Sequence, residues 1–154
     1  MASGKEFRTL YLDVCTLCRP YDDQEQVRIR LETNAVFLIL EAVRRGRYIL
    51  AASPVHYQEI GATEDPQERA DIEEILGAFG GEAKLQDPAA GRRTAQELCE
   101  QGFGVADAAH FVFAGASADC LVSCDDRFVK RAKRLYPDFP VMGPVEFCEK
   151  EGLR

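Results

Sequence analysis

The sequence predicts a single α/β domain, built as a three-layer α/β/α sandwich with a short, mostly parallel central sheet. Three observations favour this fold. Short apolar, β-prone runs alternate along the chain with longer segments of helical periodicity. The length of 154 residues suits one ordinary domain, and no repeat, low-complexity tract or linker divides it. Strands separated by helices favour parallel pairing with both faces covered, so we expect one domain over residues 1–154 with its core at about 7–148.

The first half of this pattern begins with a strand at residues 7–13 (FRTLYLD), which ends in an acid. The turn-like RPYDD follows, and a long helix is expected at residues 24–45. Apolar residues recur along one stripe of this helix: Val27, Leu31, Ala35, Leu38 and Ala42. Gly46 ends it, as a glycine just past a helix end often does. The helix has more apolar positions than one buried face requires, so we expect Phe37 and Ile39 to contribute to a homodimer surface.

The next segment is a second buried strand, expected at residues 48–52 (YILAA). Ser53 and Pro54 then begin a helix, because a capping hydroxyl followed by proline is a typical helix start. Asp65 and Pro66 begin another helix, which runs to about residue 79.

The second half of the chain continues the alternation. We expect a weak strand at 83–86, helices at 88–100 and 104–116, a buried strand at 119–123, a basic helix at 126–136 and a short strand at 141–142. In parallel sheets of this kind, ligands bind beyond the carboxyl ends of the strands. The candidate functional residues are therefore those that follow the predicted strands.

The composition is that of a soluble globular protein, with 46% hydrophobic and 29% charged residues. No apolar run approaches a membrane span, and the N-terminus (MASGKEFRTL) lacks the features of a signal peptide, so a cytoplasmic location without membrane contact is the expectation. The net charge of −7 argues against broad, charge-driven binding to nucleic acid. It does not exclude a nuclease, because a site that gathers carboxylates to hold metal makes a protein acidic.

Six cysteines are spread through the chain, and Cys15 and Cys18 form a C-x-x-C pair. No second such pair and no histidine pair completes a set of zinc ligands. A thioredoxin-like redox pair remains an alternative to two half-buried thiols without a function, and we favour the latter.

Acidic residues stand where the carboxyl ends of the strands are expected. Asp13 closes the first strand, and Asp125 and Asp126 follow the strand at 119–123. Glu59 lies in the short helix after the second strand, and Asp107 lies near the start of the helix at 104–116. Any one of them could serve only the dipole of a helix, and Asp126 in particular could be an N-cap. Together they predict a site for Mg²⁺ or Mn²⁺, because gathered carboxylates repel one another and need a hard cation.

Four segments that carry these acids resemble the acidic motifs of PIN-domain nucleases, in the family's order and over nearly the whole chain: LYLDVCTLCRPYDD, SPVHYQEI, GVADAAHFVFA and LVSCDDRFVKRA. The resemblance is to single-domain prokaryotic members, a group that includes the VapC-type toxins. It implies a PIN-like fold, a Mg²⁺- or Mn²⁺-dependent ribonuclease and a likeness to the toxins of toxin–antitoxin pairs. It further implies that RNA is the substrate, that the chain forms a homodimer, and that a toxin of this kind would have a small inhibitor protein as partner.

Carried over residue by residue, the resemblance assigns Asp13, Glu59, Asp107 and Asp125 as the catalytic, metal-binding acids, with Asp126 as an auxiliary acid. Ser123 takes the position of a serine or threonine that bonds a metal ligand or its water. The chain departs from the family after Asp13, where Val14 and Cys15 replace the usual small hydroxyl or amide residue. Thr16 is a candidate to supply that hydroxyl. Of the two histidines, His110 is expected to be packed or to contact a ligand residue, and His56 to be structural or exposed.

Substrate phosphates are expected to meet the basic helix that follows Asp125. Arg127, Lys130 and Arg131 are the candidates, although a solvated helix with cations near its C-terminus explains them equally well. Two other functions stay open. LYLDVCT is similar to the first motif of HAD-type phosphatases, but Cys15 replaces the acid that this chemistry needs. The other is a PIN-like module that binds RNA or protein with little or no catalysis.

Overall fold

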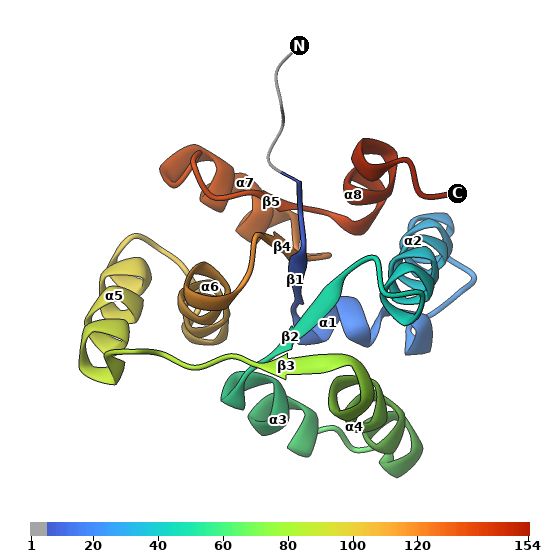
Figure 1. The fold of residues 1–154 in the computed structure, drawn as a ribbon, viewed down its shortest axis with the longest axis horizontal. Coiled ribbons are helices and arrows are strands. Elements are labelled where there is room, and N and C mark those ends of the chain that lie inside the picture. Colours follow the sequence, from blue (N-terminus) through green and yellow to red (C-terminus); the bar gives the residue numbers. More distant parts are fainter. Residues whose placement is uncertain (1–5) are drawn as a thin grey trace.

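The central layer is a five-stranded sheet with the strand order β3-β2-β1-β4-β5 (Figure 1). The structure is a computed structural model, and it describes residues 6–154. The strands are β1 (Thr9–Leu12), β2 (Ile49–Ala52), β3 (Gly80–Glu82), β4 (Cys120–Val122) and β5 (Val141–Met142). All four neighbouring pairs run parallel. The predicted α/β class and the parallel sheet are therefore confirmed.

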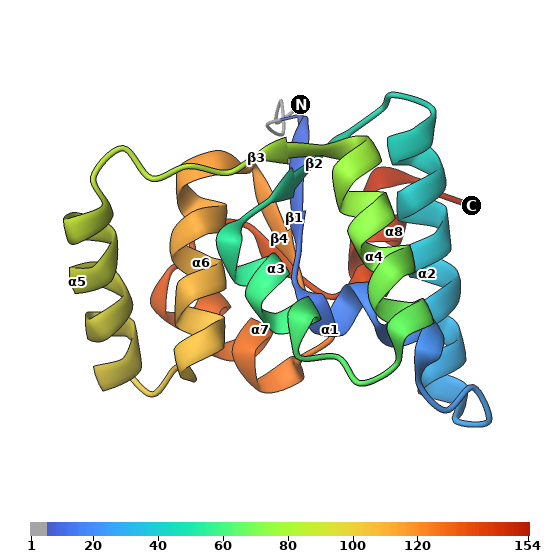
Figure 2. The same ribbon diagram turned by 90° about the horizontal axis from the view of Figure 1, so that it is seen from below.

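Helices cover both faces of the sheet and complete three layers (Figure 2). They are α1 (Val14–Leu17), α2 (Val27–Arg44), α3 (Pro54–Gly61), α4 (Pro66–Phe79), α5 (Pro88–Glu100), α6 (Val105–Ser117), α7 (Asp126–Leu135) and α8 (Pro144–Glu151), with the 3₁₀ turn η1 (Arg19–Tyr21). In both views α5 and α6 lie on one side of the sheet, and α2 and α4 on the other. Among the described residues, no helix has both the length and the apolar content that crossing a membrane requires.

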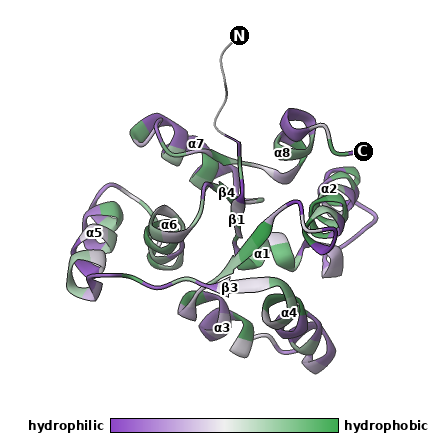
Figure 3. Ribbon diagram, viewed as in Figure 1, coloured by the Kyte–Doolittle hydropathy of each residue, from purple (hydrophilic) through white to green (hydrophobic). Residues whose placement is uncertain are grey.

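The core is divided by the alternation of side chains along each strand. Leu10 and Leu12 point to one face, where they pack with α2, α4 and α8. Tyr11 points to the other face and packs with α6 and α7. β2, β4 and β5 alternate in the same register, as successive residues of a strand must. Figure 3 shows the hydrophobic character of β2 and the more hydrophilic residues on outlying helices such as α5 and α8.

Several predicted helix starts are confirmed by their caps. The Ser53 side chain accepts from the backbone N–H of His56, and Pro54 takes the first helical position of α3. Asp65 caps α4 by accepting from the Gln67 N–H. These local signals need only a few neighbouring residues, which is why the sequence locates these helix starts correctly.

The weak strand predicted at residues 83–86 is misplaced, because β3 lies at Gly80–Glu82. Gly80 follows α4 directly, and a Cβ atom there would lie 2.2 Å from the Leu76 carbonyl oxygen and 3.0 Å from the Ala52 Cβ. A glycine thus lets the chain pass from helix to strand without a connecting loop. Only Ala83 of the predicted strand contributes, through its N–H to the Ala52 carbonyl at 2.7 Å.

The apolar stripe predicted for the long helix is wrong at its start, and one of the two dimer-surface residues is wrong. Val27 and Leu31 are exposed, and the start of α2 extends past the carboxyl ends of the strands (Figure 2). α8 packs against α2 in addition to the sheet, so the buried face is broader than one stripe. Ile39 is fully buried and cannot form a surface, whereas Phe37 is 55% exposed.

Three elements were not predicted: α1, η1 and α8. α1 is a single turn capped by the Asp13 side chain, so the first strand ends at Leu12 and leads directly into helix. α8 begins at Pro144 and places Phe147 against Phe7 and Tyr48, at ring-centroid distances of 6.0 and 5.5 Å. A Gly-Pro pair before an apolar stretch was the available signal for α8.

Candidate functional site

The four predicted acids lie at the carboxyl edge of the sheet. The strand order reverses at β1, which has β2 on one side and β4 on the other. Asp13 directly follows β1, and its backbone N–H donates to the Val122 carbonyl at 3.3 Å. Asp125 follows β4 and caps α7, Glu59 lies in α3, and Asp107 lies in the first turn of α6. A crevice where the strand order reverses is the usual ligand site of such sheets.

Asp13 is the most firmly held of these acids and is only 3% exposed. Its Oδ1 accepts from the Thr16 hydroxyl at 2.6 Å, the Thr16 N–H at 3.1 Å and the Cys15 thiol at 3.1 Å. The Thr16 hydroxyl also accepts from the Cys124 N–H at 3.0 Å, which links the loops after β1 and β4. Thr16 therefore supplies a hydroxyl to Asp13, as expected of this residue from the sequence. Within the described part of the chain, the hydrogen bonds from Thr16 and Cys15 all go to Oδ1 of Asp13.

Asp125, rather than Asp126, is the N-cap of α7. Asp125 Oδ1 accepts from the backbone N–H groups of Arg127 and Phe128, at 3.0 and 3.2 Å. The Ser123 hydroxyl accepts from the Asp125 N–H at 3.1 Å and so orients the backbone of this acid. Asp126 is exposed and forms an ion pair with Arg28 at 2.6 Å. The suggestion that Asp126 is itself the cap is wrong, because Asp126 is already the first helical residue of α7.

Glu59 lies beside a buried histidine. His110 Nε2 bonds the Glu59 Oε1, and this hydrogen bond is the main reason that the pKa of Glu59 is lowered. Glu59 thus stays ionised, with one carboxylate oxygen held by α6. His110 has the expected role of a histidine that contacts a candidate ligand residue, and His56 is buried within the cap of α3.

Asp107 lacks a comparable partner and forms no ion pair within the described range 6–154. Its pKa is raised to about 6, first by burial and then by the negative charges of Asp125, Asp13 and Glu59. Asp107 is therefore close enough to the other three carboxylates to be repelled by them. A cation at this edge would relieve the repulsion.

The oxygen donors of this cluster fit a hard divalent cation such as Mg²⁺ or Mn²⁺ in their chemistry. As the side chains are placed, no group of three or more His, Cys, Asp or Glu residues in the described part of the chain could hold a metal ion together. Direct binding of one cation by three or more of these residues therefore requires them to come closer than they lie here. Cys15 is exposed and Cys18 half-buried, and both are free thiols.

The predicted phosphate contacts divide into two kinds. Arg127 and Lys130 are exposed on α7. Arg131 instead donates to the Gly102 carbonyl at 2.5 Å and lies over the Phe103 ring at 5.8 Å, so it ties α7 to the loop between α5 and α6. A surface cavity of about 390 Å³ adjoins Asp125, and its lining includes Arg19, Arg28, Glu32, Asp126 and Arg127. Of the three candidates, only Arg127 lines this cavity.

The raised pKa of Asp107 leads to a first prediction about stability. Because the folded pKa lies above the ordinary value of 3.8, Asp107 holds its proton more tightly in the folded state, and stability falls as the pH rises from about 4 to about 6. Above that range, Asp107→Asn removes the repulsion. In EDTA at pH 7.5 we expect its melting temperature to exceed wild type by about 2–4 °C, which corresponds to about 1 kcal/mol after solvent screening.

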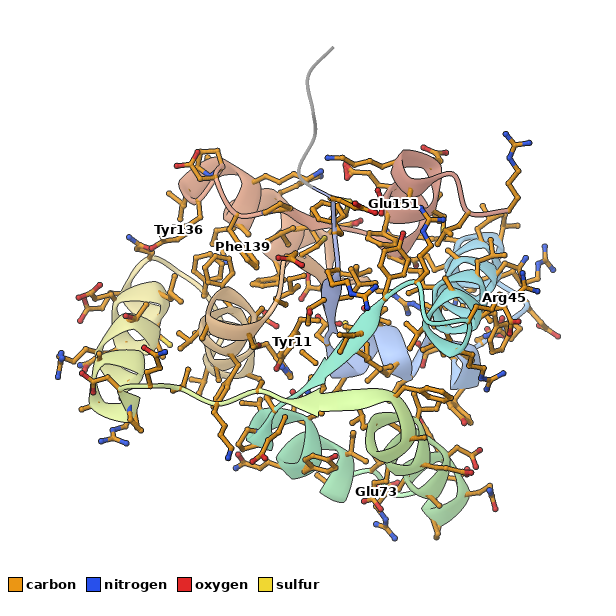
Figure 4. The ribbon with its side chains drawn as sticks, viewed as in Figure 1. Tyr11, Arg45, Glu73, Tyr136, Phe139 and Glu151 are labelled. Atoms are coloured by element: carbon orange, nitrogen blue, oxygen red, sulfur yellow. The ribbon has the colours of Figure 1, made fainter. Side chains whose placement is uncertain are left out.

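The control for this prediction is the pH dependence itself. At about pH 4 the wild-type carboxyl is largely protonated, so the two melting temperatures should agree. Glu73→Gln makes the same change of charge on the outer side of α4, where Figure 4 shows Glu73 pointing away from the sheet. Equal melting temperatures of wild type and Asp107→Asn at pH 7.5 would contradict the prediction.

Comparison with known proteins supports the fold. No protein-family model matches the chain, and no curated protein matches it. Among solved structures, it is similar to the crystal structure of FitAcB from Neisseria gonorrhoeae, with a TM-score of 0.52 over 88% of this chain and 97% of that one. The sequence identity is 15%, so the likeness shows the architecture alone. The PIN-like three-layer sandwich expected from the sequence is confirmed by this match and by the sheet topology.

Proposed function

We propose that the protein is a metal-dependent endoribonuclease that hydrolyses RNA phosphodiester bonds at the carboxyl edge of its sheet. One observation carries the proposal: four acids from four separate segments gather at one edge, and their mutual repulsion contributes to the raised pKa of Asp107. A bound cation would relieve this repulsion. The resemblance of the four motifs to PIN domains and the PIN-like fold support the same function.

In this proposal, the carboxylates of Asp13, Glu59, Asp107 and Asp125 hold Mg²⁺ or Mn²⁺. The bound ion would activate water and stabilise the charge that develops on the phosphate. The protein's own task is to keep the donors in place. Thr16 and Cys15 fix Asp13, and Ser123 orients the backbone of Asp125.

The substrate would approach across the start of α7. Arg127 and Lys130 are exposed there and are free to contact the phosphates that flank the cut, whereas Arg131 is engaged with Gly102. Phosphate contacts of this kind position a nucleic acid without reading its sequence. On the resemblance to toxins, we extend the proposal to an inhibitor protein that covers this edge, and to a homodimer in which the exposed Phe37 takes part.

The test is cleavage of a labelled, mixed-sequence RNA by the purified protein. We expect cleavage with Mn²⁺ or Mg²⁺ and none with EDTA. Two other outcomes would contradict the proposal. Hydrolysis of p-nitrophenyl phosphate without RNA cleavage would favour the HAD-type phosphatase. RNA binding without any hydrolysis would favour a PIN-like binding module.

A further inference from the structure

Behind the acidic cluster lies a continuous chain of buried polar side chains. His110, which bonds Glu59, receives or gives a second hydrogen bond through Nδ1 to the Tyr11 hydroxyl at 2.5 Å. The Tyr11 hydroxyl also bonds the Ser53 hydroxyl at 2.7 Å. Ser53 in turn contacts His56 Nδ1 through its N–H at 3.0 Å and its Oγ at 3.2 Å. Figure 4 places Tyr11 in the interior of the molecule, where the sheet, α1 and the surrounding helices meet.

The far end of this chain is fixed on the backbone of β1. His56 Nε2 lies 2.6 Å from the Leu12 carbonyl, which can only accept, so Nε2 carries a proton. His56 Nδ1 faces the Ser53 N–H, which can only donate, so Nδ1 is an acceptor and the ring is neutral. Burial also lowers the pKa of His56, to about 4, in agreement with a neutral ring. This end of the chain therefore has a single pattern of donors and acceptors.

The near end is fixed by Glu59. A carboxylate oxygen accepts, so Glu59 Oε1 is the acceptor and His110 Nε2 is the donor. The Tyr11 hydroxyl, which can donate one hydrogen bond and accept another, links His110 Nδ1 to the Ser53 hydroxyl. Burial raises the pKa of Tyr11, which keeps its hydroxyl protonated for this role. The side chains of Tyr11, Ser53, His56 and His110 are all buried, and each has a partner on both sides.

This series of hydrogen bonds connects the segments that carry three of the four acids. It bonds Glu59 of α3 directly. His110 lies one turn after Asp107 on α6, and the Leu12 carbonyl directly precedes Asp13. The spacing between β1, α3 and α6 at this edge is therefore set by hydrogen bonds, which have stricter geometry than apolar contacts.

Apolar side chains would be the simpler way to pack the part of the core that Tyr11 occupies. Tyr11 occupies the same face of the sheet as Ala51 and Leu121, within a cluster that is otherwise hydrophobic. Buried polar groups are costly unless every one is bonded, and a satisfied network rigidifies its surroundings. Among the hydrogen-bonded side chains from Glu59 to His56, Glu59 alone is substantially exposed. The network therefore ends at the candidate site.

We propose that His110, supported by Tyr11, Ser53 and His56, is a positioning residue that holds the Glu59 carboxylate ready for the metal ion. The inference rests on the proposed function. His110 occupies Oε1 of Glu59 and leaves the other carboxylate oxygen for the cation. Loss of the contact frees the Glu59 side chain to rotate and weakens metal binding, without changing how RNA phosphates are held.

The test compares His110→Leu with His110→Gln, whose side-chain amide can still donate toward Glu59. Mn²⁺ binding to each folded protein is measured from the signal of free Mn²⁺ in electron paramagnetic resonance, and cleavage is measured at saturating Mn²⁺. We expect His110→Leu to weaken Mn²⁺ affinity about 10–100-fold, the usual effect of losing a group that orients a metal ligand, and His110→Gln to restore most of it. The KM for RNA should stay at the wild-type value in both variants.

Tyr11→Phe extends the test by removing one hydroxyl while keeping the ring. It should weaken Mn²⁺ binding less than His110→Leu does, and Tyr57→Phe, at an exposed position of the same sheet edge, should leave binding unchanged. If His110→Leu does not fold, unchanged Mn²⁺ affinity in Tyr11→Phe overturns the inference and weakened affinity supports it. Wild-type Mn²⁺ affinity in a folded His110→Leu protein overturns the positioning role alone. A wild-type protein that neither binds Mn²⁺ nor cleaves RNA refutes the proposed function together with this inference.

Discussion

Asp13→Asn is expected to reduce metal-dependent RNA cleavage at least about 100-fold, the largest functional effect of any single change in this protein. The asparagine side chain would keep an oxygen acceptor for Thr16 and Cys15, so the local fold should survive. It would lose the negative charge and replace the second carboxylate oxygen with an amide nitrogen, which cannot bind Mg²⁺ or Mn²⁺. The measurement is the rate of RNA cleavage against Mn²⁺ concentration.

The matched control for this variant is Glu73→Gln, which removes one negative charge at an exposed position of α4. Its cleavage rate should equal that of wild type. Circular dichroism and the melting temperature in EDTA establish that both variants are folded. Cleavage by Asp13→Asn at more than a tenth of the wild-type rate would exclude Asp13 as a metal ligand.

Phe128→Ala is expected to lower the free energy of unfolding by about 3–5 kcal/mol, the usual cost of removing a fully buried aromatic side chain. Phe128 is 2% exposed and joins α7 to the core. Its ring contacts Phe103 edge-on at 5.7 Å and Phe111 at 6.3 Å. Tyr136 and Phe139, which Figure 4 shows close to α6, pack against the same cluster and extend it. Urea denaturation monitored by circular dichroism gives the measurement.

The control on the same helix is Leu135→Ala, because Leu135 is partly exposed at the end of α7. We expect this change to cost less than about 1 kcal/mol. Because Asp125 caps α7, the same loss of packing in Phe128→Ala should also reduce the Mn²⁺ affinity of the site. A loss of less than about 1 kcal/mol in Phe128→Ala would mean that α7 is not anchored through this ring.

The positions of α6 and α7 matter to the candidate site for the same physical reason. An acid at the edge of a sheet is useful only if its position is fixed, and three of the four acids are fixed in different ways. Asp13 is held by donors from its own turn, Asp125 by the helix that it caps, and Glu59 by His110 from another helix. Asp107 has none of these supports, which agrees with its raised pKa and makes it the acid most dependent on a cation.

The sequence by itself determined the fold class, the parallel sheet and the positions of most helices. These features depend on local chemistry: the run of apolar, buried residues in β1, the Ser53–Pro54 start of α3 and the Asp65 cap of α4 all act within a few residues. The order of the acids along the chain, from Asp13 to Asp125, was also visible, because each lies within or next to a recognisable strand or helix.

Only the tertiary structure decided which partners the acids have. His110 meets Glu59 across 51 positions of sequence, and Tyr11 meets His110 across 99, so no local pattern could reveal either contact. The same holds for Ile39, which α8 and the sheet bury together, and for Arg131, which Gly102 engages. Periodicity records which residues face inward, whereas hydrogen bonds and the breadth of a buried face depend on elements that approach from distant parts of the chain.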